Sequence, residues 1–146
     1  MAEIKVQVPA KIRIENTSTR AMSFAPYREN FTSVLAAGKA IEFSVDRAGQ
    51  VLYYLKQATP ELVVKQIAAF TASDANTTVL ETPAIMTLEN KGKLVKSFQP
   101  YKENFTVDVN GGDKYEIEVS TLGQILYYLA QGTTDLTVTY AKKAQA

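Results

Sequence analysis

The sequence predicts a mainly β protein built of two tandem homologous small antiparallel β-sandwich units, each with one candidate short helix. Three observations support this prediction. Residues 4–67 align without a gap with residues 78–141 at a constant offset of 74. Within each copy, apolar residues alternate with polar ones, as in strands that have one face on a core and one in water. Asn, Gly and Pro residues separate these runs, as expected of turns.

The repeat is clearest in two short motifs. PYRENFT at 26–32 returns as PYKENFT at 100–106, and GQVLYYL at 49–55 returns as GQILYYL at 123–129. Each copy is long enough for a core of its own, which favours paired small domains over a solenoid. The predicted organisation is a first β-sandwich repeat at 1–68, a linker at 69–77, a second β-sandwich repeat at 78–141 and a tail at 142–146.

Alternating runs mark the strands of each unit. IKVQV at 4–8 and KIRIE at 11–15 open the first unit, LVVKQI at 62–67 closes it, and LTVTY at 136–140 closes the second. TVDVNGGDKYEIEV at 106–119 predicts a hairpin, because NGGD supplies residues that tolerate positive φ, and the first unit has a matching turn at Ala37-Gly38. After the turn, the residues expected to face the core are Ile41, Phe43 and Val45 in the first unit and Tyr115, Ile117 and Val119 in the second.

The segments 47–57 and 121–131 fit either a helix or a strand. As a helix, each places four apolar residues on one stripe, with Asp46 or Ser120 as the N-cap. These residues are Ala48, Val51, Leu52 and Leu55 in the first unit and Leu122, Ile125, Leu126 and Leu129 in the second. As a strand, the run VLYYL is apolar on both faces and needs complete burial. The pattern favours a short helix and leaves the strand open.

Composition excludes several functions. The chain has 146 residues, 46% of them hydrophobic, a formal net charge of +1, and neither cysteine nor histidine. Without Cys or His there is no thiolate nucleophile, no imidazole base and no ordinary zinc site, so no cofactor or metal is expected. Balanced, scattered charge predicts neither nucleic-acid nor membrane binding. The N-terminal residues lack a basic segment before an apolar run, so we expect no secretory signal and synthesis in the cytoplasm.

Carboxylates are the remaining candidates for catalysis. The acids that recur in both copies are Glu29, Glu42, Glu103 and Glu116. Glu42 and Glu116 occupy polar positions of alternating strands, where a solvated strand face explains them. Other acids lack the spacing of a calcium loop, namely Asp74, Asp108 and Asp113. We therefore expect a protein that is not an enzyme.

The face of the candidate helix opposite the apolar stripe is a first candidate for partner binding. It carries Gln50, Tyr53, Tyr54 and Gln57, and all four are identical in the second copy. Tyrosines beside amides suit a protein interface. A second interpretation is structural: the rings cover the edge of the sandwich, and Gln50 satisfies backbone groups.

The PYRENFT loop also has two interpretations. As structure, Pro sets an extended corner, Phe31 or Phe105 enters the core, and Asn30 or Asn104 bonds to local backbone. As a site, the loop is an epitope whose cation is retained in both copies. The candidate partner-binding residues from both features are Tyr27, Arg28, Glu29, Tyr53, Tyr54, Tyr101, Lys102, Glu103, Tyr127 and Tyr128.

Three classes of function fit these features. The first is a structural or assembly protein that binds a scaffold or copies of itself. The second is a carbohydrate-binding module, for which Tyr with Asn and Gln is suitable although the chain has no Trp. The third is a protein-binding adaptor.

The order PY-x-ENFT, x-V-x-x-G-x-x-x-EIEV, G-Q-x-LYYL and a last strand LTVTY resembles small tandem β-sandwich proteins of tailed bacteriophages. These proteins decorate or cement the outside of the head. The resemblance implies a non-enzymatic virion protein, made in the host bacterial cytoplasm, that binds the major capsid protein or another virion protein and stabilises the capsid. A role in the neck or tail is the alternative within the virion. The two-unit chain departs from decoration proteins that are trimeric single domains.

Overall fold

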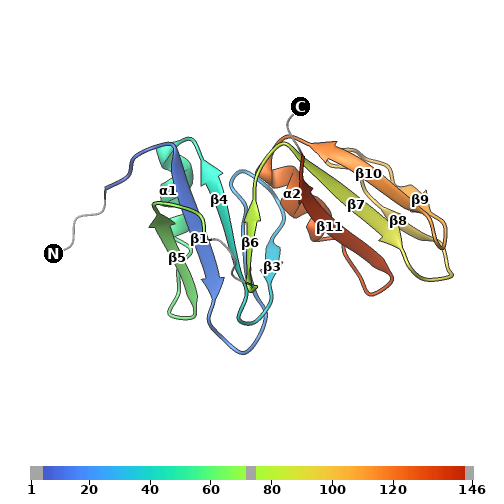
Figure 1. Ribbon diagram of the computed structural model, residues 1–146, viewed down its shortest axis with the longest axis horizontal. Helices are drawn as coiled ribbons and strands as arrows, with labels where there is room; N and C mark the ends of the chain where they lie inside the picture. Colours follow the sequence, from blue (N-terminus) through green and yellow to red (C-terminus); the bar gives the residue numbers. More distant parts are fainter. Residues whose placement is uncertain (1–4, 72–74, 144–146) are drawn as a thin grey trace. The chain divides into compact units, whose positions relative to one another are not determined.

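The computed structural model describes residues 5–71 and 75–143. The chain is mainly β, as predicted, and divides into two compact units, Met1–Leu80 and Glu81–Ala146 (Figure 1). Each unit combines a larger sheet, a two-stranded sheet and one short helix.

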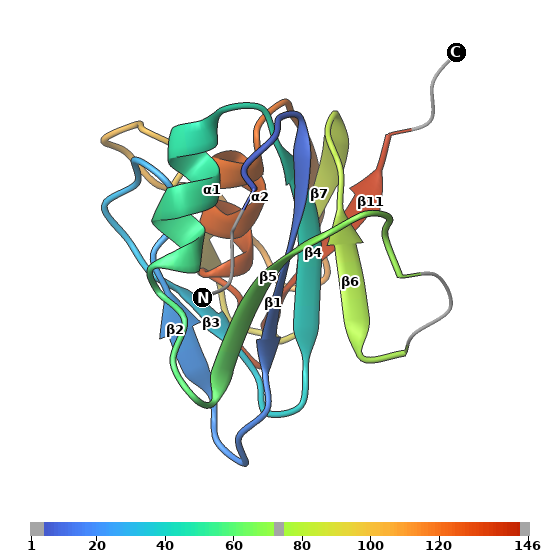
Figure 2. The same cartoon turned by 90° about the vertical axis from the view of Figure 1, so that its left-hand side faces the viewer.

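In the first unit, the larger sheet has the strand order β5-β1-β4-β6. Its strands are β1 (Ala10–Asn16), β4 (Ala40–Val45), β5 (Leu62–Ile67) and β6 (Thr77–Leu80). The central strand β1 is antiparallel to β4 and β5, whereas β6 runs parallel to β4. The smaller sheet pairs β2 (Met22–Phe24) with β3 (Ser33–Leu35). Helix α1 (Ala48–Leu55) lies on one side of the larger sheet (Figure 2).

In the second unit, the larger sheet has the order β10-β7-β11. All its pairings are antiparallel, and its strands are β7 (Ala84–Asn90), β10 (Lys114–Val119) and β11 (Leu136–Lys142). The smaller sheet pairs β8 (Lys96–Phe98) with β9 (Val107–Val109), and α2 (Leu122–Leu129) is the helix. Every element of the second unit begins 74 residues after an element of the first. Strand β6 is the one described element of the first unit without such a counterpart.

The predicted hairpin at 106–119 is wrong, although its turn is correct. Gly38 and Gly112 have φ of 74° and 87°, the positive values expected at these turns. However, β9 pairs with β8 while β10 pairs with β7, so the turn connects two sheets. The physical reason is that the end of β7 reaches into the turn: the Asn90 carbonyl accepts a hydrogen bond from the Gly112 N–H at 2.8 Å. The first unit repeats this bond between Asn16 and Gly38 at 2.9 Å.

A buried asparagine joins the two sheets of each unit. The Asn16 Nδ2 donates to the carbonyls of Arg20 and Leu35 at 2.7 and 2.9 Å. Asn90 makes the equivalent bonds to Leu94 and Val109 at 2.7 and 2.8 Å. Both side chains are fully buried, and in each case the amide bonds to the backbone of the smaller sheet or its connection. Buried polar groups require such partners, which explains why both units retain this residue.

The segments 47–57 and 121–131 contain helices, which settles the choice between helix and strand. The N-caps are Arg47 and Thr121, one residue later than predicted. The Gln50 Oε1 accepts from the backbone N–H of Arg47 at 2.9 Å, and Gln124 does the same for Thr121 at 3.0 Å. These glutamines satisfy amides that a helix leaves without partners at its start.

The predicted buried stripe is only partly correct. Val51, Ile125 and Leu126 are buried, but Leu52 is 55% exposed. Tyr54 is buried at 2% exposure instead. Its ring contacts Phe24 of β2 and Phe43 of β4 at centroid distances of 6.4 and 5.0 Å, so the tyrosine fills the space between the sheets.

The structural boundary between the units differs from the boundary that the repeat predicts. Residues 78–80, which the alignment assigns to the second copy, form part of β6 in the first unit. The strand predicted at 4–8 is also absent over its described part, since residues 5–8 belong to no strand. Residue 4 lies outside the described residues.

Candidate partner-binding site

The PYRENFT loop of each unit is a tight turn held from inside. The Glu29 N–H donates to the Pro26 carbonyl at 3.2 Å, and the Glu103 N–H donates to the Pro100 carbonyl at 3.1 Å. The third residue of the turn has positive φ, 60° at Arg28 and 59° at Lys102. A non-glycine residue in this region costs roughly 1–2 kcal/mol. Such strain at matching surface positions motivates a hypothesis of function.

Tyr54 and Tyr128 support these loops from the core. The Tyr54 hydroxyl accepts a hydrogen bond from the Tyr27 N–H at 2.9 Å, and Tyr128 accepts one from the Tyr101 N–H at 3.0 Å. The two rings are only 2% and 4% exposed. Burial raises the pKa of Tyr54 to about 12, although the hydrogen bond opposes that shift. The expectation that Tyr54 and Tyr128 contact a partner is therefore corrected, because both lie inside their units.

Gln57 and Gln131 also have structural positions. The Gln57 Oε1 accepts from the Ala25 N–H at 2.7 Å, and its Nε2 donates to the Ala25 carbonyl at 3.0 Å. Gln131 makes the same pair of bonds with Gln99, at 2.7 and 2.9 Å. Each amide thereby holds the strand that leads into the loop. These glutamines and Gln50 fit the structural interpretation of the helix face.

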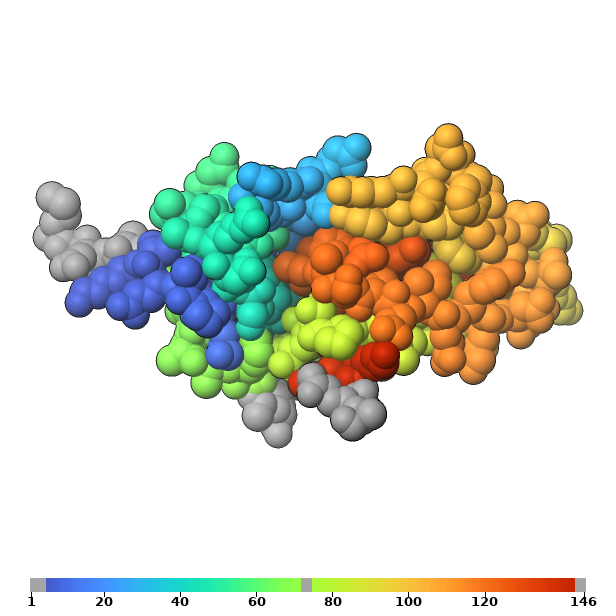
Figure 3. All heavy atoms as spheres, turned by 90° about the horizontal axis from the view of Figure 1, so that it is seen from above, coloured from blue at the N-terminus to red at the C-terminus, as the bar shows by residue number. Residues whose placement is uncertain are grey.

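Tyr53 and Tyr127 remain at the surface and join the loop residues. Tyr53 is half-buried and packs edge-to-face on Tyr27 at 5.5 Å, and Tyr127 packs on Tyr101 at 5.3 Å. Burial raises the pKa of Tyr127. We call the groups of Tyr27, Arg28 and Tyr53 and of Tyr101, Lys102 and Tyr127 the corner clusters. Figure 3 shows both loops (blue and gold) at the surface of their own units.

Each corner cluster carries a cation on an aromatic face. The Arg28 guanidinium lies 5.3 Å from the Tyr27 ring centre, and the Lys102 ammonium lies 5.4 Å from the Tyr101 ring centre. Lys56 adds a second cation at 5.3 Å from Tyr53. Ring contact and charge together hold these side chains in defined positions. The remaining loop acids, Glu29 and Glu103, are half-buried and exposed, respectively.

Several apolar side chains of the loops and of β10 are more exposed than predicted. Phe105 is 53% exposed, so the expectation that it enters the core is wrong. Phe31 is half-buried. Tyr115 is 43% exposed and Ile117 is half-buried, whereas Ile41 and Phe43 are buried as predicted.

Glu42 does not lie on a solvated strand face, and that expectation is corrected. Its carboxylate is fully buried and lies 2.6 Å from the Arg13 guanidinium. The Thr71 N–H and hydroxyl donate to it at 2.6 and 2.7 Å. Burial alone raises the pKa of Glu42, but these hydrogen bonds and Arg13 hold it below its ordinary value. Glu116 is exposed, and Thr87 stands where the first unit has Arg13.

Sequence reasoning missed Arg13, although a signal was present. The glutamate is retained in both units while its partner position changes from Arg to Thr. The change from Arg13 to Thr87 indicates that the ion pair with this glutamate forms in the first unit alone. That contact depends on Thr71, which lies 29 residues from Glu42 and covers it after the chain leaves β5.

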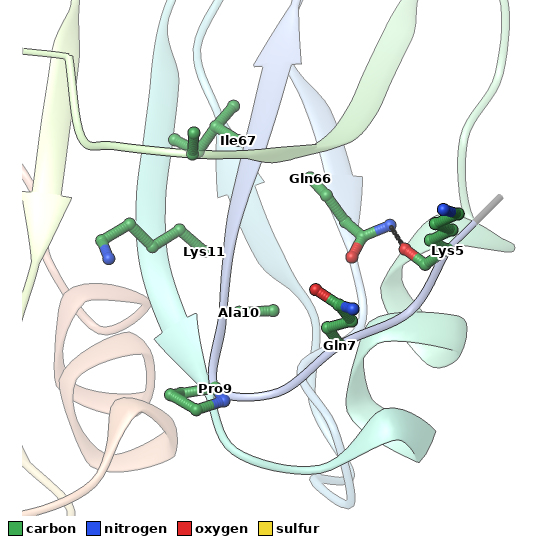
Figure 4. A pocket seen from close by; sticks show the side chains of 8 residues that line it. Lys5, Gln7, Pro9, Ala10, Lys11, Gln66 and Ile67 are labelled. Atoms are coloured by element: carbon green, nitrogen blue, oxygen red, sulfur yellow. Dashed lines mark hydrogen bonds between the residues drawn. The ribbon is translucent and has the colours of Figure 1, made fainter.

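A shallow pocket of about 240 Å³ lies in the first unit (Figure 4). Lys5, Gln7, Pro9, Lys11 and Gln66 are among its lining residues. The Gln66 Nε2 donates to the Lys5 carbonyl at 3.1 Å, so the pocket holds amides and ammonium groups without a lining carboxylate. Over residues 5–71 and 75–143, no group of three or more potential ligands is placed to hold a metal ion.

The two corner clusters are thus paired candidate sites on a mainly β scaffold. Comparisons with models of protein families, with curated proteins and with solved structures give no match. Within the part of the chain that the structure describes, no helix has the length and apolar character needed to cross a membrane.

Proposed function

We propose that the protein is a non-enzymatic structural protein of a tailed-phage virion, assembled in the host cytoplasm, that binds the outside of the capsid and decorates or stabilises it. The observation that carries this proposal is the corner cluster, which the chain builds twice with the same supporting hydrogen bonds. A repeated site on one chain suits a partner that is itself repeated, such as the major capsid protein in its shell.

The chemistry of the clusters supports a protein partner. Tyr and Arg are enriched where protein interfaces are most strongly held, because they combine a large contact area with hydrogen bonds. Tyr27 and Tyr53 are half-buried, so each ring has exposed area left for contact. The cation at Arg28 or Lys102 favours a surface that presents carboxylates or carbonyl groups.

Two sites on one chain also strengthen attachment. Once the first corner cluster is bound, the second is held near the partner surface at a raised effective concentration. Modest affinity at each cluster then gives firm attachment overall. The turn geometry at Arg28 and Lys102 and the contact of each cation with a tyrosine ring favour one arrangement before binding, which reduces the entropy lost on contact.

The position of the carboxylates supports a non-catalytic role. The buried Glu42 is engaged by Arg13 and Thr71, and its counterpart Glu116 is exposed on a strand. A duplicated catalytic acid would require equivalent surroundings in both units. These two glutamates have different surroundings.

The test begins with particles purified from the cells in which the protein is made. We expect the chain to co-purify with heads and to appear on their outer surface by electron microscopy. In a binding assay with such heads, the variant Arg28→Ala with Lys102→Ala should lose occupancy. A control with two other exposed cations removed, Lys65→Ala with Lys93→Ala, should bind normally. Absence of the chain from particles, or equal binding by both variants, would overturn the proposal.

A further inference from the structure

The outer edges of the equivalent strands β4 and β10 differ. Strand β6 covers the edge of β4 in parallel register, with Ile41 opposite Thr78 and Phe43 opposite Leu80. Among the described residues, β10 pairs with β7 alone. The consequence is visible in exposure: Ile41 is 9% exposed, while its counterpart Tyr115 is 43% exposed. Residues of β10 (orange) also reach the surface of the second unit in Figure 3.

The start of the first copy corresponds to β6. At the offset of 74, Thr77–Leu80 aligns with residues 3–6, whose sequence is EIKV. The alternation in this stretch predicts a strand, yet residues 5–8 form none. The described part of this segment makes a side-chain contact instead, from Gln66 to the Lys5 carbonyl. The sequence thus contains an alternating segment whose described residues lie in no strand, and among the described residues the outer edge of β10 has no strand partner.

We propose that residues 3–6 of a second copy of this chain add to β10 as a parallel strand, as β6 adds to β4. Transfer of the observed register pairs Lys114 with Glu3, Tyr115 with Ile4, Glu116 with Lys5, and Ile117 with Val6. Both charged pairs have opposite signs. Because side chains alternate across a strand, the two apolar pairs share the face that packs on the core.

The connection of the chain favours a second copy as the donor. The strand that covers β4 comes from the start of the next unit in the sequence. The strand for β10 should therefore have the sequence of the start of a unit, and the described part of residues 3–6 lies against Gln66 of the first unit in its own chain. Residues 3–6 of another molecule have the sequence of such a start. An exposed sheet edge is a ready template for this type of addition.

The resulting interface joins unlike surfaces. Each molecule gives its N-terminal segment and offers its own β10, so the contact repeats head to tail and forms either an open chain or a ring. The contact should be weaker than that of β6, because the anchor formed by Glu42, Arg13 and Thr71 has no described equivalent in the second unit. We expect reversible association that increases with concentration. This inference does not depend on the proposed attachment to a capsid.

The charge pair between Lys5 and Glu116 provides a specific test. Each of the variants Lys5→Glu and Glu116→Lys places like charges opposite one another and should weaken self-association about fivefold, measured by sedimentation equilibrium. An equimolar mixture of the two variants restores opposite charges at every contact between unlike molecules and should associate like the parent. Lys65→Glu, an exposed charge reversal on β5, is the control and should have no effect. A chain that stays monomeric at all concentrations overturns the proposal, as does a mixture that fails to associate.

Cross-linking tests the register and the identity of the donor. The chain has no cysteine, so every disulfide in the variant Lys5→Cys with Glu116→Cys joins introduced thiols, and the two single variants show how much arises from like pairs. Oxidation should give a ladder of multimers on a non-reducing gel. Lys5→Cys with Glu118→Cys shifts the second thiol by two residues along the same face and should give a much weaker ladder. A disulfide confined to monomers would place the segment on its own chain and overturn the assignment to a second copy.

Discussion

The hydroxyl of Tyr54 accepts a hydrogen bond from the backbone N–H of Tyr27 at 2.9 Å. The tyrosine belongs to α1 and lies in the core, while the loop that it holds lies at the surface. Tyr128 and Tyr101 repeat the arrangement at 3.0 Å. The shape of each corner cluster therefore depends on a core residue, which links the stability of a unit to the geometry of its proposed site.

Removal of this hydroxyl tests that link. In Tyr54→Phe, the ring packing is retained, but the Tyr27 N–H loses its partner. We expect a loss of about 1–3 kcal/mol in the free energy of unfolding, measured in urea, because an unsatisfied buried donor carries its desolvation cost. Tyr53→Phe is the matched control at the neighbouring position and should change the free energy by less than about 0.5 kcal/mol. Equal effects of the two substitutions would contradict the assigned role of Tyr54.

The raised pKa of Tyr54 predicts alkaline destabilisation. The folded protein holds this proton to about pH 12, whereas the ordinary pKa is 10.0. The stabilising contribution is therefore complete below pH 10 and disappears as the pH rises through 12. Unfolding of the parent and of Tyr54→Phe should be compared between pH 8 and 12. Relative to Tyr54→Phe, the parent should lose roughly 2–3 kcal/mol of stability as the pH rises over this range. A difference that is independent of pH would rule out this titration.

Much of the architecture follows from local patterns. Alternation over 11–15 and the offset of 74 predicted β1, β7 and the order of the elements, because side-chain period and turn chemistry are local properties. Strand partners are not local. The sequence between Val107 and Val119 looks like a hairpin, but β10 pairs with β7, whose residues are far away in the chain.

The candidate site was predicted in part for the same reason. The repeat indicated Tyr27, Arg28 and Tyr53 as candidates on two separate features, and it did not predict that the loop and the helix bring them into contact. The repeat does not distinguish a surface residue from a buried residue that supports the loop, because Tyr53 and Tyr54 are both identical in the two copies. Burial of Tyr54 depends on contacts with Phe24 and Phe43, which helical periodicity does not contain.

The ion pair between Arg13 and Glu42 gives a prediction about stability. Glu42→Gln removes the carboxylate that lies 2.6 Å from Arg13, whose side chain is 13% exposed, and leaves this largely buried cation with the more distant Glu15 at 3.4 Å. We expect a loss of about 3 kcal/mol in the free energy of unfolding at pH 7. Glu116→Gln changes the equivalent exposed position and should have an effect below about 0.5 kcal/mol. Similar losses from both variants would contradict the burial of Glu42.

The same glutamate predicts acid sensitivity of the first unit. Because the folded-state pKa of Glu42 lies below its ordinary value of 4.5, its contribution is present above pH 4.5 and is lost as the pH falls through the folded pKa. Glu42→Gln lacks this group, so its stability should depend less on pH than that of the parent below pH 4.5. Chemical unfolding at a series of acid pH values measures the difference. Parallel pH profiles for the two proteins would exclude the predicted titration.

Two substitutions of Arg28, which has a positive φ, test its effect on stability and its effect on binding independently. Glycine adopts this conformation without a Cβ clash, so Arg28→Gly should raise the free energy of unfolding by about 1 kcal/mol, whereas Arg28→Ala keeps the strain and should not. Both variants remove the cation that lies over Tyr27, so both should bind heads less well than the parent. Thermal unfolding and the head-binding assay report the two effects independently. If the glycine variant gains stability and also binds normally, the cation has no part in attachment, and the corner cluster is a structural turn alone.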